Sequence, residues 1–478
     1  MAGIAGLLIR NTSNDLEIMF QKMLGVSRHR RYESYNTVKH NNSHCVIAGA
    51  HSFQSPDGDL VVIDRNQDLV FPHWIKDDAS ISKLFGAIIV IVGDKGLSLI
   101  RTPDGTRALY YGFKPSCLAF ATERKNLWSV GITDVQSLQP GMVVTQPWDG
   151  VIFHKRVATL EEPQKTSATH QETLKFLRRI LSASFERIRE DTSCAILFSG
   201  GVDSSLVATL ASNRCNSSIL VTSCSEGAHD DSAAIEAAEQ IGLPLHTVEL
   251  NSLVIWETLP EVIYAIETSR QMDVEIALPF YLASKRAMEE GCTTVISGQG
   301  PDELFGGYAR HVQTFTKKGA DALNLQLFQE VSITHKTNIE RDERAIAAHG
   351  VESFFPYLDW NFVRASLSVP VEWKVSPYRS PQRKIIFREL AQLMGVPSKI
   401  AQAPKSATQY SSGSSKALLD SVLHHVDGLK ETSRKKASQQ VQDVLDEIAY
   451  QIGIPNVKRK NEQLKLDMES VSRFLERH

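Results

Sequence analysis

The segment Leu197–Ser205, with the sequence LFSGGVDSS, constrains the fold of this chain more than any other segment. A short apolar run at 194–198 predicts a buried strand before it, and the apolar residues at 206–210 predict a helix after it. Glycines allow a sharp turn, and the freed N–H groups and the helix N-terminus can then face an anion. The pattern therefore predicts a phosphate-binding loop, with a capped strand-to-helix turn as the purely structural alternative.

The side chains of this segment match that chemistry. The serine hydroxyls add hydrogen-bond donors. Asp203 alone would repel phosphate, so a bridging Mg²⁺ is its natural partner. The segment lacks the lysine and the spacing of a Walker P-loop. Its predicted nucleotide-binding residues are Leu197, Ser199, Gly200, Gly201, Asp203, Ser204 and Ser205.

Composition limits the class of protein. A chain of 478 residues with 42% hydrophobic and 22% charged residues is typical of a globular protein of two or three domains. The formal net charge of −3 gives no strong attraction to nucleic acid or to acidic membranes. The six cysteines are scattered without a CxxC pair, which argues against a zinc site and fits a reducing cytoplasm. The longest apolar run, 87–92, is too short to span a bilayer, so we expect a cytoplasmic protein.

Strand-like and helix-like segments alternate through the middle of the chain, which predicts a parallel sheet with helices on both faces. Ligands of such sheets bind beyond the carboxyl ends of the strands, which is where the first glycine-rich segment falls. The chain after residue 310 is predicted to be mostly helical. The predicted strands are 194–198, 218–224, 245–250 and 293–297, and the predicted helices 170–190, 206–214, 231–242 and 279–291.

A second glycine-rich segment, Ser297–Tyr308, reads SGQGPDELFGGY and also follows an apolar run. Two loops at the carboxyl ends of parallel strands can face one site. Asp203 and Asp302 are therefore predicted to hold Mg²⁺ against a triphosphate. The nucleotide-binding residues expected from this loop are Ser297, Gly298 and Gly300.

Three further segments follow in order: RDERAIAAHGVESFFPYLD at 341–359, QRKIIFRE at 382–389 and KSATQYSSG at 405–413. With the two loops they resemble the synthetase domain of the asparagine synthetase family, which includes β-lactam synthetases and lasso-peptide cyclases. The resemblance covers about residues 170–416. It implies that a carboxylate attacks the α-phosphate of ATP, with Mg²⁺ offsetting charge on the leaving pyrophosphate. A nitrogen nucleophile then displaces AMP from the acyl-adenylate and leaves an amide.

The resemblance also implies roles for single residues. Lys405 matches the cation near the α-phosphate, and Glu352 matches the carboxylate that accepts a proton from the attacking amine. Their structural alternatives are a solvated loop lysine and an ion pair at a helix end. Gln299 replaces a glutamate common in glutamine-dependent asparagine synthetases, which would leave Glu352 as the base. Further contacts to ATP or to the substrate carboxylate are expected from Ser223, on the strand that would read adenine, Arg341 and Lys384.

Residues 1–155 resemble a class II glutamine amidotransferase, an Ntn-type domain built as an antiparallel β sandwich. The functional domain uses its N-terminal cysteine as the nucleophile. Here that position is Ala2, either natural or an engineered replacement of cysteine. The segment 29–33 reads HRRYE instead of HRGPD, 51–53 lacks the arginine that clamps glutamine, and no NGE motif occurs. We therefore expect an inactive glutaminase domain that is kept as a scaffold.

The expected organisation is a 1–155 amidotransferase-like domain, a 170–416 parallel-sheet ATP-pyrophosphatase domain and a helical extension at 417–478. The favoured function is an ATP-dependent amide ligase that uses ammonia or an amine, with aspartate as the default acceptor. A peptide or metabolite synthetase or cyclase is the variant within this class. The competing classes are tRNA thiolation or nucleobase modification, against which the absence of a cysteine pair and the net charge of −3 argue, and a catalytically weak scaffold. A homodimer and a protein partner on the C-terminal helices stay open.

Overall fold

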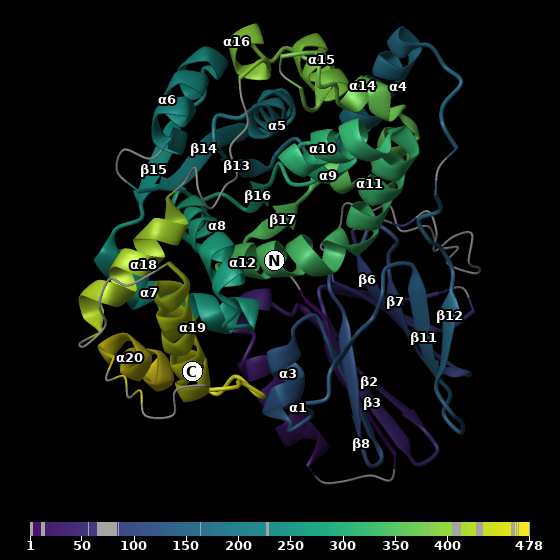
Figure 1. The fold of residues 1–478 in the computed structure, drawn as a ribbon. Coiled ribbons are helices and arrows are strands. Elements are labelled where there is room, and N and C mark those ends of the chain that lie inside the picture. The colour runs from purple at the N-terminus through teal and green to yellow at the C-terminus, as the bar shows by residue number, and fades with distance from the viewer. Residues whose placement is uncertain are drawn as a thin grey trace. The chain divides into compact units, whose positions relative to one another are not determined.

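The chain folds into two compact units, residues 1–159 with 453–457 and 478, and residues 160–452 with 458–477. Figure 1 shows their elements as a computed structural model. Two positions important for the predictions, Ala2 and Lys405, lie outside the described residues. The described residues are 3–10, 15–55, 57–64, 84, 86–162, 164–225, 229–380, 382–403, 413–426, 434–459, 464, 466 and 468–477.

The first unit contains two six-stranded sheets whose strand pairs are all antiparallel. One sheet has the order β10-β8-β9-β1-β3-β2 and the other the order β12-β11-β7-β6-β5-β4. The first sheet consists of β1 (Ala5–Arg10), β2 (Ser34–His40), β3 (Ser43–Gly49), β8 (Tyr110–Lys114), β9 (Cys117–Ala121) and β10 (Gln136–Ser137). The second consists of β4 (His51–Gln54), β5 (Leu60–Ile63), β6 (Ile88–Gly93), β7 (Gly96–Arg101), β11 (Met142–Gln146) and β12 (Phe153–Arg156).

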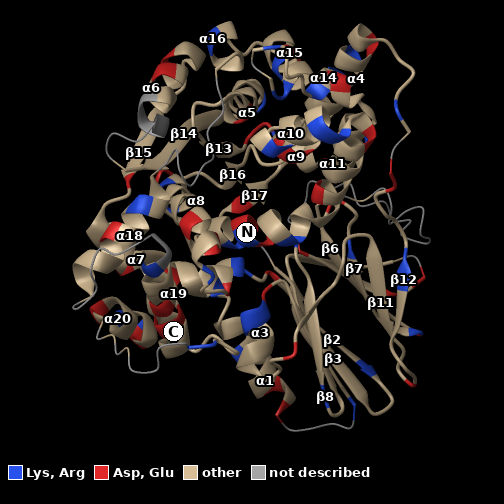
Figure 2. Ribbon diagram, viewed as in Figure 1, with Lys and Arg blue, Asp and Glu red and all other residues tan. Residues whose placement is uncertain are grey.

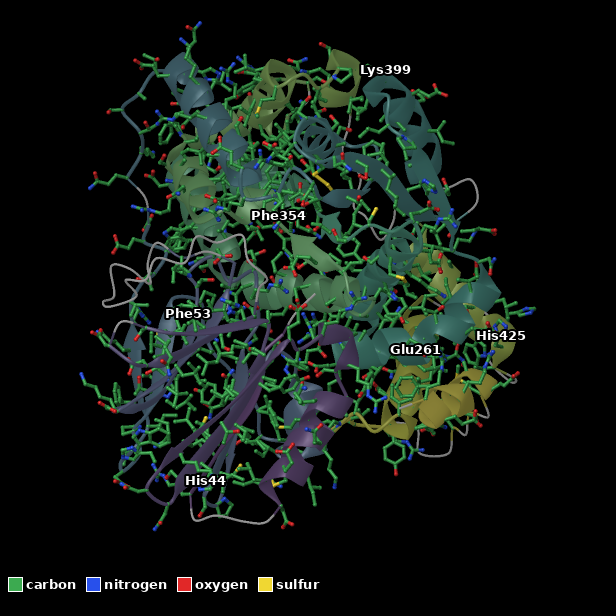
Figure 3. The ribbon with its side chains drawn as sticks, turned by 180° about the vertical axis from the view of Figure 1, so that it is seen from behind. His44, Phe53, Glu261, Phe354, Lys399 and His425 are labelled. Atoms are coloured by element: carbon green, nitrogen blue, oxygen red, sulfur yellow. A yellow bond between two sulfur atoms is a disulfide. The ribbon has the colours of Figure 1, made fainter. Side chains whose placement is uncertain are left out.

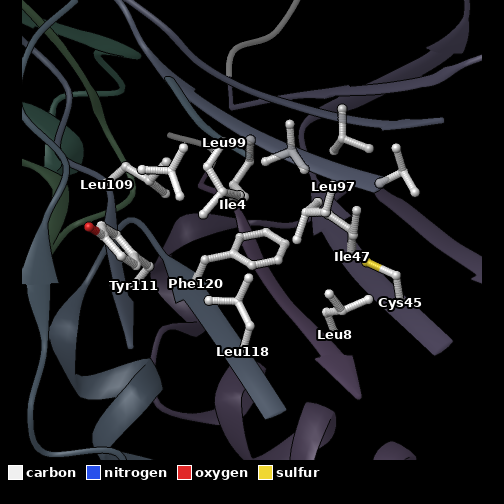
Figure 4. Packing of buried hydrophobic residues seen from close by; sticks show 14 of the residues in the cluster. Ile4, Leu8, Cys45, Ile47, Leu97, Leu99, Leu109, Tyr111, Leu118 and Phe120 are labelled. Carbon is white, nitrogen blue, oxygen red and sulfur yellow. The ribbon is translucent and has the colours of Figure 1, made fainter. Parts of the chain in front are cut away.

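Apolar side chains from both sheets form one buried cluster (Figure 4). Ile47 and Phe120 come from the first sheet, and Leu97 and Leu99 from the second. Burial of each such side chain stabilises the fold by about 1.5–3 kcal/mol. The predicted antiparallel sandwich is therefore confirmed. The helices of this unit are α1 (Leu16–Gly25), the 3₁₀ turn η1 (Arg28–Arg30) and α3 (Arg124–Ser129).

The second unit is built on a five-stranded sheet in the order β15-β14-β13-β16-β17, with every pair parallel. This confirms the predicted parallel sheet. Its strands are β13 (Ser193–Leu197), β14 (Ser217–Cys224), β15 (Leu245–Glu249), β16 (Thr294–Ile296) and β17 (Glu352–Phe354). Helix α4 (His170–Phe185) precedes the first strand, and α5 (Val202–Ser212), α6 (His229–Ile241), α7 (Ser252–Ile266) and α8 (Gln271–Glu289) connect the next strands.

Two elements of this unit differ from the sequence prediction. Helix α8 begins at Gln271 rather than at residue 279, because Pro279 lies inside the helix and its buried face packs on the sheet. Strand β17 was not predicted, since the chain after residue 310 was expected to be mostly helical. It is only three residues long and is defined by its pairing with β16.

Apart from β17, the elements from residue 301 to the end of the described chain are helices. A π-helix, η2 (His335–Ile339), lies between α11 (Ala320–Thr334) and α12 (Glu340–Ala347). The others are α9 (Pro301–Leu304), α10 (Ala309–Lys318), η3 (Pro356–Leu358), α13 (Trp360–Ser368), α14 (Val371–Lys374), α15 (Ile385–Leu393), α16 (Ser398–Ala401), α18 (Ser414–His425), α19 (Arg434–Gln451) and α20 (Glu469–Arg477).

The C-terminal helices pack on their own unit. The predicted apolar stripe of α19 is buried, and α18, α19 and α20 all contact α7. His425 stacks on Trp256 and Phe474 meets Tyr264, each with ring centroids 5.0 Å apart. Figure 3 labels His425 and Glu261 on these helices. The stripe consists of Val441, Val444, Leu445, Ile448 and Ile452.

The cysteines, which are scattered in the sequence without a CxxC pair, include one bonded pair. Cys194 and Cys215 form a disulfide (Figure 3), because β13 and the segment after α5 bring their Cα atoms to 6.6 Å. The two cysteines are 21 positions apart in the sequence, and no recognisable sequence signal links them. Cys45, Cys117, Cys224 and Cys292 are buried and form no disulfide. No helix within the described ranges has the length and apolar character needed to cross a membrane.

Candidate active site

The first glycine-rich loop leaves the carboxyl end of β13 and enters α5. Gly200 has φ 72°, and a Cβ at this position would lie 2.3 Å from the carbonyl oxygen of Ala233. Only glycine fits this left-handed, crowded turn. The backbone N–H of Ser199 donates to Ser204 Oγ at 3.3 Å, which closes the loop on the first turn of α5. Ser205 Oγ is buried and has no hydrogen-bond partner among the described residues.

The second glycine-rich loop leaves the neighbouring strand, β16, and touches the first loop. A Cβ on Gly298 would lie 3.2 Å from the backbone of Asp203 and Ser204. The hydroxyl of Tyr357 donates to the carbonyl of Asp203 at 2.8 Å and ties η3 to the same place. Gly300, with φ 120°, completes the turn into α9.

Both loops lie where the strand order of the parallel sheet reverses. β14 and β15 extend from one side of β13, and β16 and β17 from the other. Ligands of open parallel sheets bind in the crevice outside the carboxyl ends of the strands at such a point. The structure thus brings together the loop residues that the sequence predicted as one site: Leu197, Ser199, Gly200, Gly201, Asp203, Ser204, Ser205, Ser297, Gly298, Gly300 and Asp302.

Lys384 lies between the two aspartates predicted to hold a metal. Its Nζ is 2.6 Å from Asp203 Oδ2 and 2.6 Å from Asp302 Oδ1. A Cβ on Gly307 would lie 2.4 Å from Lys384 Cε, so glycine is needed beside this ion pair. Burial opposes the charge of Lys384, but the two carboxylates outweigh it and raise the pKa of the ammonium above its ordinary value. The structure therefore places a buried cation where the sequence predicted an ion between two carboxylates.

One carboxylate oxygen at this position fits an additional cation. Asp203 Oδ1 is buried and has no hydrogen-bond partner in the part of the chain that the structure describes. The same residues contain no cluster of three or more His, Cys, Asp or Glu side chains suited to a metal. Mg²⁺ at Asp203 and Asp302 would therefore need phosphate oxygens and water to complete its coordination.

Ser223 lies near the carboxyl end of β14, the neighbour of β13. The two strands pair through Leu197 and Val221, and Phe198 N–H donates to the Val221 carbonyl at 2.9 Å. The hydroxyls of Ser223 and Ser225 are both buried without a hydrogen-bond partner among the described residues. Unpaired buried hydroxyls beside the first loop fit a polar ligand at this edge of the sheet.

A buried carboxyl that the sequence analysis missed supports the second loop. Glu303 accepts a hydrogen bond from Tyr308 Oη at 2.7 Å and another from Asn338 Nδ2 at 3.2 Å, both on Oε1. Burial, with a smaller contribution from neighbouring Asp302, raises the pKa of Glu303 to about 7. Its partners are Tyr308, at the end of the same glycine-rich segment, and Asn338 on the π-helix, 35 residues further along the chain.

Helix α12 carries a second functional candidate that the sequence did not indicate, Asp342. Its charged residues 340–344 are all buried, and acidic and basic positions are interspersed along the helices of this unit (Figure 2). Gln299 Nε2, from the second loop, donates to Asp342 Oδ2 at 3.0 Å. Arg341 Nε donates to Asp342 Oδ1 at 2.7 Å, and its Nη1 lies 3.4 Å from Asp273 Oδ1. Burial raises the pKa of Asp342 to about 6, although Arg341 opposes this shift.

Glu352 lies away from the loop edge on its strand, and Arg341 is engaged differently from the prediction. Glu352 pairs with Thr294 at the amino end of β16, two residues before the carboxyl edge where the loops lie. Strands rise by about 3.3 Å per residue, so its backbone lies roughly 7 Å from that edge. Arg341, expected to bind phosphate or substrate, pairs with Asp342 and Asp273. Lys405 lies outside the described residues.

Comparison with known proteins identifies the family. The model of the asparagine synthase family matches residues 176–326 and 313–475. The chain belongs to the asparagine synthase family. This confirms the resemblance found in the motifs, and the match extends beyond residue 416. Membership indicates an ATP-dependent carbon–nitrogen ligase.

The relatives agree with this assignment. A protein of Methanocaldococcus jannaschii named "Putative asparagine synthetase 1, glutamine-hydrolyzing" is 31% identical over 390 residues, which cover 72% of each chain. Asparagine synthetase 2 of Arabidopsis thaliana, also named as glutamine-hydrolyzing, is 27% identical over 303 residues, 61% of this chain and 51% of that protein. The chain thus spans about half the length of its plant relatives.

Solved structures give weaker likenesses. The phosphoribosylpyrophosphate amidotransferase of B. subtilis has a TM-score of 0.28 at 13% identity, covering 52% of this chain and 65% of that one. The NMN synthetase of Francisella tularensis has a TM-score of 0.26 at 16% identity, covering 63% of this chain and 100% of that one. Likenesses at these TM-scores bear on neither fold nor function.

Proposed function

We propose that this protein activates a carboxylate with ATP, releases pyrophosphate and joins the acyl group to ammonia or an amine. Aspartate is the first acceptor to test. The observation that carries the proposal is the Asp203–Lys384–Asp302 bridge at the edge where two glycine-rich loops meet. Such an edge offers backbone N–H groups, hydroxyls and a buried ammonium to a polyphosphate.

The described residues would act on the leaving pyrophosphate. The first loop and the N-terminus of α5 would bind its oxygens through N–H groups and the hydroxyls of Ser199 and Ser205. Lys384 would stabilise the charge that develops when the bond to the α-phosphate breaks. Mg²⁺, held by Asp203 and Asp302, would supply Lewis-acid stabilisation. Lys405 remains our proposed cation for the α-phosphate.

We propose Asp342 as the group that accepts the proton of the attacking amine. Gln299 is an amide and cannot act as a base, and Glu352 lies at the amino end of its strand. Asp342 is the carboxylate that contacts the Gln299 side chain, at 3.0 Å. A carboxylate with a pKa near 6 is a better base at neutral pH than an unperturbed one. Asp342 therefore supplies the carboxylate that Gln299 does not provide.

The pH dependence tests this role. Since Asp342 must be ionised to accept a proton, amide formation is expected to rise with pH through an apparent pKa of about 6. Asp342→Asn is expected to lower the rate by about 10²–10⁴-fold and to remove this rise. Rates of product formation between pH 5 and 8 provide the measurement. A parallel loss in Glu352→Gln, with Asp342→Asn left active, would instead support Glu352 as the base.

The overall reaction is tested by pyrophosphate release. The protein is expected to release pyrophosphate and AMP from ATP when Mg²⁺, ammonia and a suitable acid are present. Acceptor acids are screened with aspartate first, followed by other amino acids and peptides. Release that does not depend on any acid would contradict the proposal.

We also propose that the first unit does not hydrolyse glutamine. Arg30, in the segment that replaces HRGPD, donates to buried Glu123 at 2.5 Å, and Lys125 pairs with the same carboxylate at 2.7 Å. A Cβ on Gly3, next to Ala2, would lie 2.7 Å from Thr122 Oγ1 and 3.1 Å from Arg30 Cβ. The space beside Gly3 is therefore filled. Glutamine is expected to support amide formation at a small fraction of the ammonia rate, and equal rates with both donors would contradict an inactive glutaminase.

A further inference from the structure

The turn between α7 and α8 is bound by the C-terminal helix α19. Gln442 Oε1 accepts the backbone N–H of Gln271 at 2.9 Å, and Gln442 Nε2 donates to the carbonyl of Ser269 at 2.9 Å. Asp446 Oδ1 accepts the hydroxyl of Ser269 at 2.7 Å and Gln442 Nε2 at 2.8 Å. Asp446 is buried. The two side chains thus satisfy the backbone on both sides of Arg270, where α8 begins.

The opposite side of the same turn is held by α12. Glu267, the last residue before the turn, has φ 59°, and its buried carboxylate accepts Arg344 Nη1 at 3.1 Å. A non-glycine residue with a positive φ persists where its surroundings fix it. The turn is therefore fixed from α12 on one side and from α19 on the other.

A continuous chain of charged contacts runs from this turn to the second loop. Arg270 donates to both carboxylate oxygens of Asp273, at 2.6 and 2.7 Å. Asp273 contacts Arg341, which donates to Asp342. Asp342 accepts the amide of Gln299. Asp273, Arg341 and Asp342 are all buried, so their contacts are little screened by solvent.

We propose that Gln442 and Asp446 are positioning residues for the acceptor end of the active site. They hold the first turn of α8, and through Arg270, Asp273 and Arg341 they orient Asp342 and the side chain of Gln299. The C-terminal helix would then be part of the catalytic unit rather than an appended tail. The kinetic consequence rests on the proposed function, in which Asp342 accepts the proton of the attacking amine.

Two variants of one residue separate positioning from general stability. Asp446→Ala removes the acceptor of Ser269 and Gln442. Asp446→Asn keeps an oxygen for both donors and serves as the conservative rescue. Asp443→Ala, one turn earlier on α19, is the matched control, because Asp443 accepts a hydrogen bond from Gln439 at the surface of the same helix.

Hydrogen–deuterium exchange of the full chain without ligands is the first measurement. Asp446→Ala is expected to speed exchange at 268–275 and at 297–304 while exchange at 199–206 stays unchanged. Asp446→Asn and Asp443→Ala are expected to exchange like the parent protein. A change that stops at 268–275, or an equal change in the Asn and Ala variants, would overturn the proposal.

Kinetics provide the second measurement. With the acid found by the pyrophosphate screen, Asp446→Ala is expected to raise the KM for the acid about tenfold or more, since small misplacements of positioning groups are costly. The KM for ATP is expected to change less than the KM for the acid, because the first loop is not part of the relay. Equal changes in both KM values would overturn the proposal. If no acid supports pyrophosphate release, the proposed function fails, and the exchange pattern still decides the positioning role.

Discussion

Replacing Asp203 by asparagine is expected to lower the rate of pyrophosphate release by about 10²–10³-fold or more. Asp203 Oδ2 accepts Lys384 at 2.6 Å, and its Oδ1 is buried and open to a further cation. An amide keeps the shape of the carboxylate but loses its charge and can turn an NH₂ group toward the ammonium. The variant should therefore misplace Lys384 and lose the metal ligand together. Pyrophosphate release with saturating ATP and acid measures the loss.

Asp191→Asn is the matched control for this experiment. Asp191 precedes β13, is exposed, and pairs with Arg189 at 2.7 Å outside the glycine-rich loops. It should retain the parent rate, and thermal melting should show that both variants are folded. If Asp203→Asn kept more than about a tenth of the activity while folded, neither the metal role nor the contact to Lys384 would be essential.

Replacing Lys374 by methionine is expected to stabilise the protein. Lys374 Nζ is fully buried, 5.9 Å from the centre of the Phe305 ring, and has no hydrogen-bond partner among the described residues. Burial lowers the pKa of Lys374 from 10.5 to about 7. At 1.36 kcal/mol per pKa unit, keeping this ammonium charged below pH 7 costs on the order of 5 kcal/mol. Methionine has a similar length and carries no charge to desolvate.

The pH dependence gives this prediction its sign. Between pH 7 and 10 the unfolded state holds a proton on Lys374 that the folded state has lost. The free energy of unfolding of the parent protein should therefore rise with pH across this window. Lys374→Met should remove that part of the rise, whereas Lys318→Met, at an exposed position of α10, should keep it. Urea denaturation at pH 7, 8.5 and 10 measures the free energy of unfolding of the parent and of both variants. If Lys374→Met were less stable than the parent at pH 7, Lys374 would instead stabilise the folded protein.

The features that sequence could predict are local ones. A strand, a glycine turn and a helix start occupy consecutive residues at 194–206, so periodicity and turn chemistry specify them together. The same holds for 294–304 and for the alternation that predicted the parallel sheet. Because carboxyl ends of parallel strands share one edge, the meeting of the two loops followed from the fold class.

The features that sequence missed depend on long-range contacts. Lys384 reaches Asp203 across 181 residues, and Gln299 reaches Asp342 across 43. Nothing in the segment QRKIIFRE indicates that its lysine would lie between two carboxylates. Strand β17 has three residues, too few for a periodic signal, and only its pairing with β16 shows that Glu352 lies at the amino end. The family pattern located these segments, but it could not orient their side chains.

The strands β13 and β16 are neighbours in the sheet, yet residues 198–293 separate them in the sequence. That long excursion forms α5, β14, α6, β15, α7 and α8 before the chain returns beside its starting point. Substitutions on the exposed faces of this excursion can therefore accumulate while the pairing of β13 with β16 keeps the two glycine-rich loops side by side. Such a chain can evolve toward a new acceptor compound while it keeps the same two glycine-rich loops for the nucleotide.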